Sequence, residues 1–153
     1  MKKKGLVIFL LLFMVLLFNG CSSKEGTFEC TRTANYGTYK MNLLYTVEYN
    51  GNYVKKVKST EKIESDDKNL LEQYKTQIEN QYSAYSGIEN YNYEVKIEEN
   101  ILTSTVDIYY EKVDTDKMIE IDSANSQLIK NGKILTKDLK TVYESIGATC
   151  NEK

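Results

Sequence analysis

The chain has 153 residues, enough for one small domain, and carries 20 basic against 22 acidic side chains. Nucleic-acid binding is not expected, because it favours clustered Lys and Arg, and the chain has a single arginine, Arg32. It also has no His, so the most common general base and zinc ligand is missing. The 13 tyrosines reflect either the base composition of the genome or a surface suited to an interface.

The beginning of the chain has the pattern of an export signal. Three lysines, at positions 2–4, precede an unbroken apolar run over residues 6–18. That run is too short for a membrane-spanning helix, which needs about 20 residues. It suits the apolar segment of a signal peptide.

Gly20 and Cys21 complete a sequence that resembles the lipobox of bacterial lipoproteins, although Phe18 and Asn19 depart from its usual residues. The resemblance implies that residues 1–20 are a signal peptide and that the Cys21 thiol carries a diacylglycerol. Residues 21–27 are then the lipidated cysteine and a short tether, and residues 28–153 a single domain. The expected location is the extracytoplasmic face of the cell membrane, held by the lipid anchor. The alternative is an uncleaved membrane anchor.

Two further cysteines, Cys30 and Cys150, stand near the two ends of the expected domain. An exported protein meets conditions that permit disulfides, and the ends of a domain often lie close together. We therefore expect a Cys30–Cys150 disulfide, with two free thiols as the alternative. A metal or catalytic role is less favoured, because the sequence has neither a CxxC motif nor a His partner.

The first half of the domain is predicted to contain a β-hairpin and a helix. Apolar and polar side chains alternate over residues 40–49, Asn50-Gly51 is a strong turn signal, and the return strand is expected over residues 53–63, with Tyr53 in phase with the apolar side chains. A helix is predicted from Ser65, as its cap, to Tyr85, with Gly87 as a left-handed stop. Its apolar stripe is Leu70, Leu71, Tyr74, Ile78, Tyr82 and Tyr85.

The second half is predicted to repeat this order. Residues 91–98 alternate, Glu99-Asn100 is expected to form a turn, and residues 101–113 form the partner strand. Residues 114–127 fit either a short strand or a helical turn. After a turn at Asn131-Gly132, Thr136 is expected to cap a last helix that ends at Gly147. The fold class is α+β: an antiparallel sheet of two hairpins with two helices packed on one face.

This order of elements after a lipobox resembles the YehR-like family of small bacterial lipoproteins. The resemblance covers roughly residues 40–147. It is carried by residues 45–57, 85–88, 93–95, 106–114 and 146–147. It implies an α+β lipoprotein domain whose function is uncharacterised.

No catalytic, cofactor-binding or metal-binding motif is present in the sequence. Acid pairs such as Asp107 with Asp114, or Glu98 with Glu99, are interpreted as solvated charges, and Asp114-Thr115-Asp116 lacks the glycine and terminal glutamate of a calcium loop. We expect a non-enzymatic binding module whose partner is an envelope protein, the cell wall or a small ligand. The alternative is a carboxylate-dependent envelope enzyme, such as a wall-glycan hydrolase, with two carboxylates about 5–10 Å apart.

The lipobox predicts a clear effect of removing the thiol of Cys21. The variant Cys21→Ala should take up no lipid label and should accumulate as uncleaved precursor, because the resemblance to the lipobox implies that the Cys21 thiol is the lipid-accepting group. Metabolic labelling with a fatty acid, followed by mass spectrometry of the amino terminus, measures both effects. A variant that is labelled and cleaved like the parent would show that Cys21 is not the lipidation site.

Overall fold

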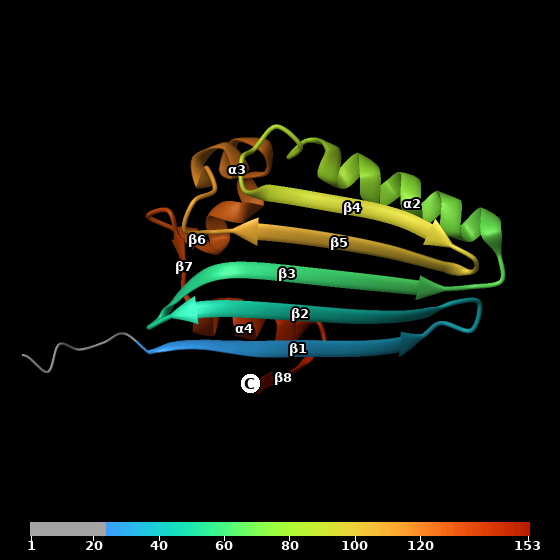
Figure 1. The fold of residues 1–153 in the computed structure, drawn as a ribbon, viewed down its shortest axis with the longest axis horizontal. Helices are drawn as coiled ribbons and strands as arrows, with labels where there is room; N and C mark the ends of the chain where they lie inside the picture. The colour runs from blue at the N-terminus through green and yellow to red at the C-terminus, as the bar shows by residue number, and fades with distance from the viewer. Residues whose placement is uncertain (1–23) are drawn as a thin grey trace, which may run out of the picture.

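The computed structural model describes residues 24–153, which form one antiparallel sheet of six strands in the order β4-β5-β3-β2-β1-β8. The strands are β1 (Glu25–Asn35), β2 (Lys40–Asn50), β3 (Tyr53–Glu64), β4 (Tyr91–Glu98), β5 (Ile101–Tyr109) and β8 (Thr149–Glu152). The helices are α2 (Lys68–Ser83), α3 (Thr115–Ile121) and α4 (Thr136–Ser145), with a 3-10 helix, η2 (Ser123–Gln127). A small hairpin pairs β6 (Ile129–Lys130) with β7 (Lys133–Ile134) (Figure 1). The α+β class predicted from the sequence is confirmed.

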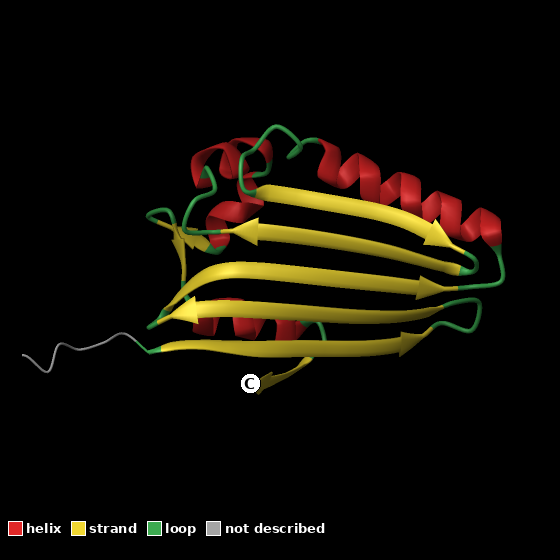
Figure 2. Cartoon of the chain, in the orientation of Figure 1, coloured by secondary structure: helices red, strands yellow, loops and turns green. Residues whose placement is uncertain are grey.

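The register of the sheet separates a covered face from an open one. Val47, Val57 and Ile108 lie opposite one another on β2, β3 and β5, and all three are buried. The intervening positions carry polar side chains such as Lys58 and Thr46, which face the other side. The long helix α2 contacts β4 and β5, whereas α4 contacts β1 and β8 (Figure 2). The hydrophobic core therefore lies between one face of the sheet and these two helices.

The two predicted hairpins, β2–β3 and β4–β5, are both present with the expected turns. The expected phase of Tyr53 is wrong, because a β-bulge interrupts the register beside Glu48 and Tyr49. As a result Val54 is buried, while the side chain of Tyr53 is 45% exposed. The second strand of the second hairpin, β5, is shorter than the predicted range of residues 101–113, because it ends at Tyr109.

The sequence did not predict the strands at one side of the sheet. All 11 residues of β1 pair with β2, and β1 begins at Glu25, so residues 25–27 belong to the sheet rather than to a tether. The C-terminal strand β8 pairs with the other side of β1. These two strands bring the beginning and the end of the domain together.

Helix α2 buries Leu71 and Ile78 of the predicted stripe, while Tyr74 and Tyr82 are half-buried. Its predicted ends are wrong. The cap is Asp67, whose carboxylate accepts hydrogen bonds from the backbone N–H groups of Asn69 and Leu70. Ser65 instead donates from its hydroxyl to the carbonyl of Thr38, at 2.8 Å. The helix ends at Ser83, and Gly87 lies in the turns that follow.

The segment of residues 114–127, for which the sequence left a strand or a helical turn open, contains the helix α3. The carboxylate of Asp114 caps this helix by accepting a hydrogen bond from the backbone N–H of Lys117. In α4, Gly147 has a φ of +86° and ends the helix as predicted. The N–H of Ala148 donates to the carbonyl of Tyr143, which is the Schellman arrangement. Thr136 is not the cap: it is the first helical residue, and its backbone N–H donates to the carbonyl of Asn52.

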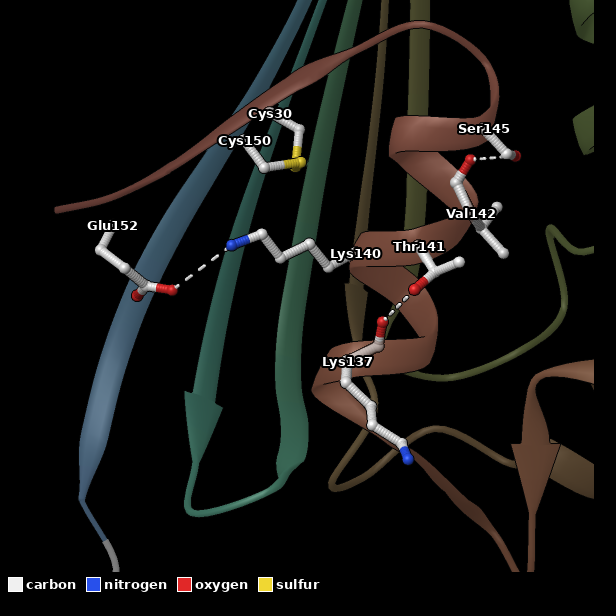
Figure 3. Close-up of a disulfide and its surroundings, with 8 residues drawn as sticks. All are labelled: Cys30, Lys137, Lys140, Thr141, Val142, Ser145, Cys150 and Glu152. Carbon is white, nitrogen blue, oxygen red and sulfur yellow. Dashed lines mark hydrogen bonds and ion pairs between the residues drawn. A yellow bond between two sulfur atoms is a disulfide. The ribbon is translucent and has the colours of Figure 1, made fainter.

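The disulfide between Cys30 and Cys150 is present in the structure and joins β1 to β8 (Figure 3). The two residues face each other in the strand register, and their Cα atoms are 4.0 Å apart. Beside it, the Lys140 ammonium of α4 lies 4.0 Å from the Glu152 carboxylate of β8. Within residues 24–153 no helix is long and apolar enough to cross a membrane.

The packing of α2 predicts that its stripe contributes to stability. Ile78→Ala should destabilise the domain by about 2–5 kcal/mol through lost burial and the cavity that remains. For a domain of this size, this corresponds to a melting temperature lower by roughly 10 °C. The exposed neighbour Gln77→Ala is the control and should melt like the parent, as followed by circular dichroism. Equal melting of both variants and the parent would contradict the packing of α2.

Candidate functional site

The covered face of the sheet has a polar depression over its central strands, which we call the Glu61 crevice. It encloses a cavity of about 40 Å³ between β2, β3, β5 and the end of α2. The side chains that define it are Leu43, Tyr45, Ser59, Glu61, Tyr82 and Ser104. A cavity of this volume holds a single water molecule or the head of a slender side chain.

The strand register places the polar residues of the crevice on the covered face. Glu61 lies between Leu43 on β2 and Ser104 on β5 in one row across the sheet. The adjacent row on this face holds Ser59, between Tyr45 and Val106. Because side chains two residues apart share a face, Glu61 follows Val57 and Ser59 and precedes the buried Ile63 on the same side. Polar groups therefore occupy positions where the strand pattern places core residues.

Glu61 is half-buried, and burial raises the pKa of its carboxyl group, because a charged carboxylate is less favourable away from water. Within residues 24–153 its side chain has no hydrogen-bond or ion-pair partner. Arg32 lies in the same row beyond Leu43, but its guanidinium donates a hydrogen bond to the Tyr36 hydroxyl at 3.4 Å and forms no ion pair with Glu61. The carboxyl group of Glu61 therefore has no opposite charge or hydrogen-bond donor within residues 24–153 to replace the hydration that it loses, and we call its charge uncompensated.

Tyrosine rings form both walls of the crevice. On one side Tyr45 of β2 stacks on Tyr143 of α4, with ring centroids 4.1 Å apart and an interplanar angle of 13°. On the other side Tyr82 of α2 lies against Tyr93 of β4, with centroids 6.0 Å apart. Each wall thus connects one helix to the sheet. Glu61 lies on the strand between the two walls.

Burial, and next the negative charge of Glu61, raises the pKa of the Tyr45 and Tyr82 phenols above the ordinary value for tyrosine. These phenols therefore keep their protons at physiological pH. In this state they present hydrogen-bond donors and ring faces, and no added negative charge, to whatever enters the crevice.

A second cavity lies on the other side of Tyr82. It has a volume of about 450 Å³ and is lined by α2, the ends of β4 and β5, α3 and η2. Its tyrosines include Tyr85 and Tyr91, which stack with centroids 4.9 Å apart. The one carboxylate in its lining, Asp122, accepts a hydrogen bond from the N–H of Ala124 and caps η2. This cavity therefore adds aromatic surface, whereas its acid is used in structure.

The sequence did not single out Glu61. A signal was present, because Glu61 is in phase with Val57 and Ile63 on the apolar side of its strand. Of the predicted site residues, Cys30 and Cys150 are joined in the structure, whereas Cys21 lies outside the described residues. The acidic candidates Asp107 and Asp114 lie on β5 and at the start of α3, where Asp107 pairs with Lys56 and Asp114 caps the helix. Within residues 24–153 no group of three potential metal ligands comes together.

A family model described as a protein of unknown function, DUF1307, matches residues 30–148. The chain belongs to the DUF1307 family. The matched span runs from the disulfide cysteine of β1 to the residue before β8, and so contains the whole Glu61 crevice. None of the curated proteins compared with the chain matches it. Membership in DUF1307 therefore brings no activity with it.

Two solved structures resemble this DUF1307 domain. The Escherichia coli YehR protein, solved by NMR, is 20% identical, with a TM-score of 0.55 over 84% of this chain and 91% of that chain. A protein from Streptococcus pneumoniae, also solved by NMR, is 14% identical, with a TM-score of 0.53 over 87% of this chain and 88% of that chain. At these identities the likeness shows the fold alone. The resemblance to YehR predicted from the sequence is confirmed at that level.

The uncompensated charge predicts that Glu61→Gln stabilises the domain at neutral pH. Because the folded state holds the proton more tightly than the unfolded state, the stability of the parent falls as pH rises from the ordinary glutamate range through the raised pKa. The variant has no such loss, so its melting temperature should exceed that of the parent by a few degrees at pH 7. The difference should vanish below about pH 4, where both forms are neutral.

Calorimetry at several pH values measures this effect. Glu64→Gln is the matched control, since Glu64 lies on the same strand and is exposed. A Glu61→Gln variant that is less stable than the parent at pH 7 would mean that the carboxylate has a partner and is not uncompensated.

Proposed function

We propose that the protein is a lipid-anchored binding module of the cell envelope and that the Glu61 crevice receives an ammonium group of its ligand. The binding is non-enzymatic in this proposal. The ligand is a small molecule, or an envelope or cell-wall partner, that presents a primary amine on a narrow alkyl stem. The observation that carries the proposal is a half-buried carboxylate without a partner, set between two tyrosine walls.

The charge of Glu61 supports this choice of ligand. A carboxylate that has lost part of its hydration gains more from an opposite charge than an exposed one, because the surrounding dielectric is lower. An ammonium group has three N–H donors, which match the carboxylate of Glu61 and the hydroxyl groups of Ser59 and Ser104 in the same cavity.

The shape and the walls of the crevice support the same conclusion. The cavity of about 40 Å³ has room for an ammonium head and excludes a bulky group. Tyrosine faces attract cations through the ring quadrupole, and Tyr45 and Tyr82 both line this cavity. A narrow stem between tyrosine rings also buries its methylene groups, which adds a hydrophobic contribution.

The acid content of the crevice favours binding over glycan hydrolysis. Hydrolysis of a glycosidic bond uses two carboxyl groups that flank the bond. Glu61 is the only carboxylate among the residues that line the smaller cavity, and the acid of the larger cavity caps a 3-10 helix. A single carboxylate is sufficient to hold an amine.

Two features support a place in the envelope. The sequence before residue 21 has the pattern of a lipoprotein signal, and the domain carries a disulfide between Cys30 and Cys150. Disulfides persist in oxidising compartments outside the cytoplasm. Both features agree with a domain that is exported and then held at the membrane surface.

The proposal predicts that n-butylamine binds and that n-butanol, of similar shape but neutral, does not. NMR titration of the protein should show shifts at Glu61, Ser104 and Tyr82 with the amine only. Glu61→Gln should weaken binding by about 10- to 100-fold, the usual effect of losing a charged hydrogen bond. Glu64→Gln on the same strand should bind like the parent.

Equal binding of the amine and the alcohol, or an unchanged affinity in Glu61→Gln, would overturn this assignment of the ligand. Because Glu61→Gln is expected to be the more stable protein at pH 7, a loss of binding in that variant is not explained by unfolding.

A further inference from the structure

One end of the domain collects lysine and tyrosine side chains around the point where the chain enters the sheet. We call it the tether end: residue 24, the β2–β3 turn with residues 51–55, the loop of residues 109–112 and the β6–β7 turn with residues 131–133. These segments lie together at the left of Figure 1. The N–H of Gly51 donates to the carbonyl of Lys24 at 3.0 Å, and Tyr53 forms a β-bridge with Leu135.

The position of the chain entry restricts where a lipid at Cys21 lies. Only Ser22 and Ser23 lie between Cys21 and Lys24, which makes three steps along the chain, and a fully extended chain advances at most about 3.6 Å per step. An anchor at Cys21 therefore lies within roughly 11 Å of Lys24. The tether end must then face the membrane, because no longer linker is available to hold the domain away from it.

The chemistry of the tether end suits the surface of a bilayer. Tyr53 and Tyr109 are 45% and 39% exposed, and tyrosine is favoured where an apolar phase meets water. The ammonium group of Lys133 lies 4.8 Å from the ring centre of Tyr53, and that of Lys112 lies 5.8 Å from the ring centre of Tyr109. Within residues 24–153 neither lysine forms an ion pair.

The tether end has more basic than acidic side chains, so its net charge is positive. Lys55 pairs with Glu25 at 2.9 Å, and Glu111 lies in the same loop as Lys112. Lys24 and Lys133 add positive charge beyond these pairs. The tether end also holds an open cavity of about 710 Å³, lined by Tyr53, Lys55, Glu111 and Lys133 among others.

The opposite end of the sheet has the reverse character. The β1–β2 turn, the β3–α2 connection and the β4–β5 turn lie there, at the right of Figure 1. The acidic residues at this end are Glu64, Asp66, Asp67, Glu98 and Glu99. Lys40 and Lys68 lie at the same end and Lys96 pairs with Glu98, so the net charge there is negative. The charge of the domain therefore changes along the strand direction, from positive at the end where the chain enters the sheet to negative at the opposite end.

We infer that the tether end is a docking surface for anionic phospholipid headgroups of the membrane that holds the anchor. Lys112 and Lys133 contact the phosphates, and the rings of Tyr53 and Tyr109 lie at the level of the headgroups. The domain stands on the membrane with its strands directed outward, and the acidic end faces away. The inference rests on the lipid anchor proposed above and is independent of the ligand proposed for the Glu61 crevice.

The absence of tryptophan from the chain allows a direct test. Tyr53→Trp places a single tryptophan at the tether end, and Tyr36→Trp places one at the far end, where Tyr36 is 49% exposed. Each full-length lipidated protein is reconstituted into phosphatidylcholine vesicles with or without phosphatidylglycerol, using brominated lipids as quenchers. Trp emission of the Tyr53→Trp protein should fall about twofold in the anionic vesicles, and that of the Tyr36→Trp protein should be unchanged.

Charge removal provides a second readout. Lys112→Gln combined with Lys133→Gln, in the Tyr53→Trp background, should lower the ratio of docked to undocked protein about 25-fold, since each lysine near an anionic surface contributes about fivefold. Equal quenching at the two ends, or equal quenching with and without phosphatidylglycerol, would overturn the docking surface while flotation with the vesicles still reports an intact anchor. Protein that does not float with the vesicles would overturn the anchor and the docking surface together.

Discussion

The width of the sheet is the constraint on which the rest of the domain depends. Six strands spaced about 4.8 Å apart present a face roughly 25 Å wide, whereas one helix covers about 10 Å of it. The helix α2 covers the β4 side and α4 covers the β1 side, so the middle strands receive no helix of their own. Large tyrosine rings fill part of this gap by joining each helix to the sheet. The Glu61 crevice is the part that remains.

A carboxylate in such a gap is costly for folding, because no protein group compensates its lost hydration. A core residue at position 61 would complete the pattern set by Val57 and Ile63 on the same strand. Functional sites are the places where a sequence departs from the rule that otherwise builds its core. The departure is local, because the rows that contain Val57 and Ile63, on either side of Ser59 and Glu61, place buried apolar side chains on this face.

The sequence was sufficient to predict the parts whose signals are local. Alternation and turn residues predicted both hairpins, and Gly147 predicted the end of the last helix. The strands β1 and β8 were not predicted, because neither has a clear alternation of apolar and polar residues. The buried apolar residues of β1 are Phe28 and Cys30, and β8 is held by its pairing and its disulfide. The start of α2 was misplaced because Ser65 and Asp67 are equally suitable caps, and only the three-dimensional contact of Ser65 with Thr38 decides between them. The crevice depends on the pairing of three strands, β2, β3 and β5, and on the packing of α2 over them, and no local sequence pattern contains this information.

The arrangement of β1 has a mechanical consequence. Any pull between Lys24 and the far ends of the strands runs along β1, so the hydrogen bonds of its 11 residues bear the load in shear and must break together. A hairpin pulled open from its ends would instead lose its bonds one at a time. The covalent link to β8 also prevents β1 from sliding out past the C-terminal strand. Force that enters the domain at Lys24 is therefore carried by β1 and by the two strands that pair with it.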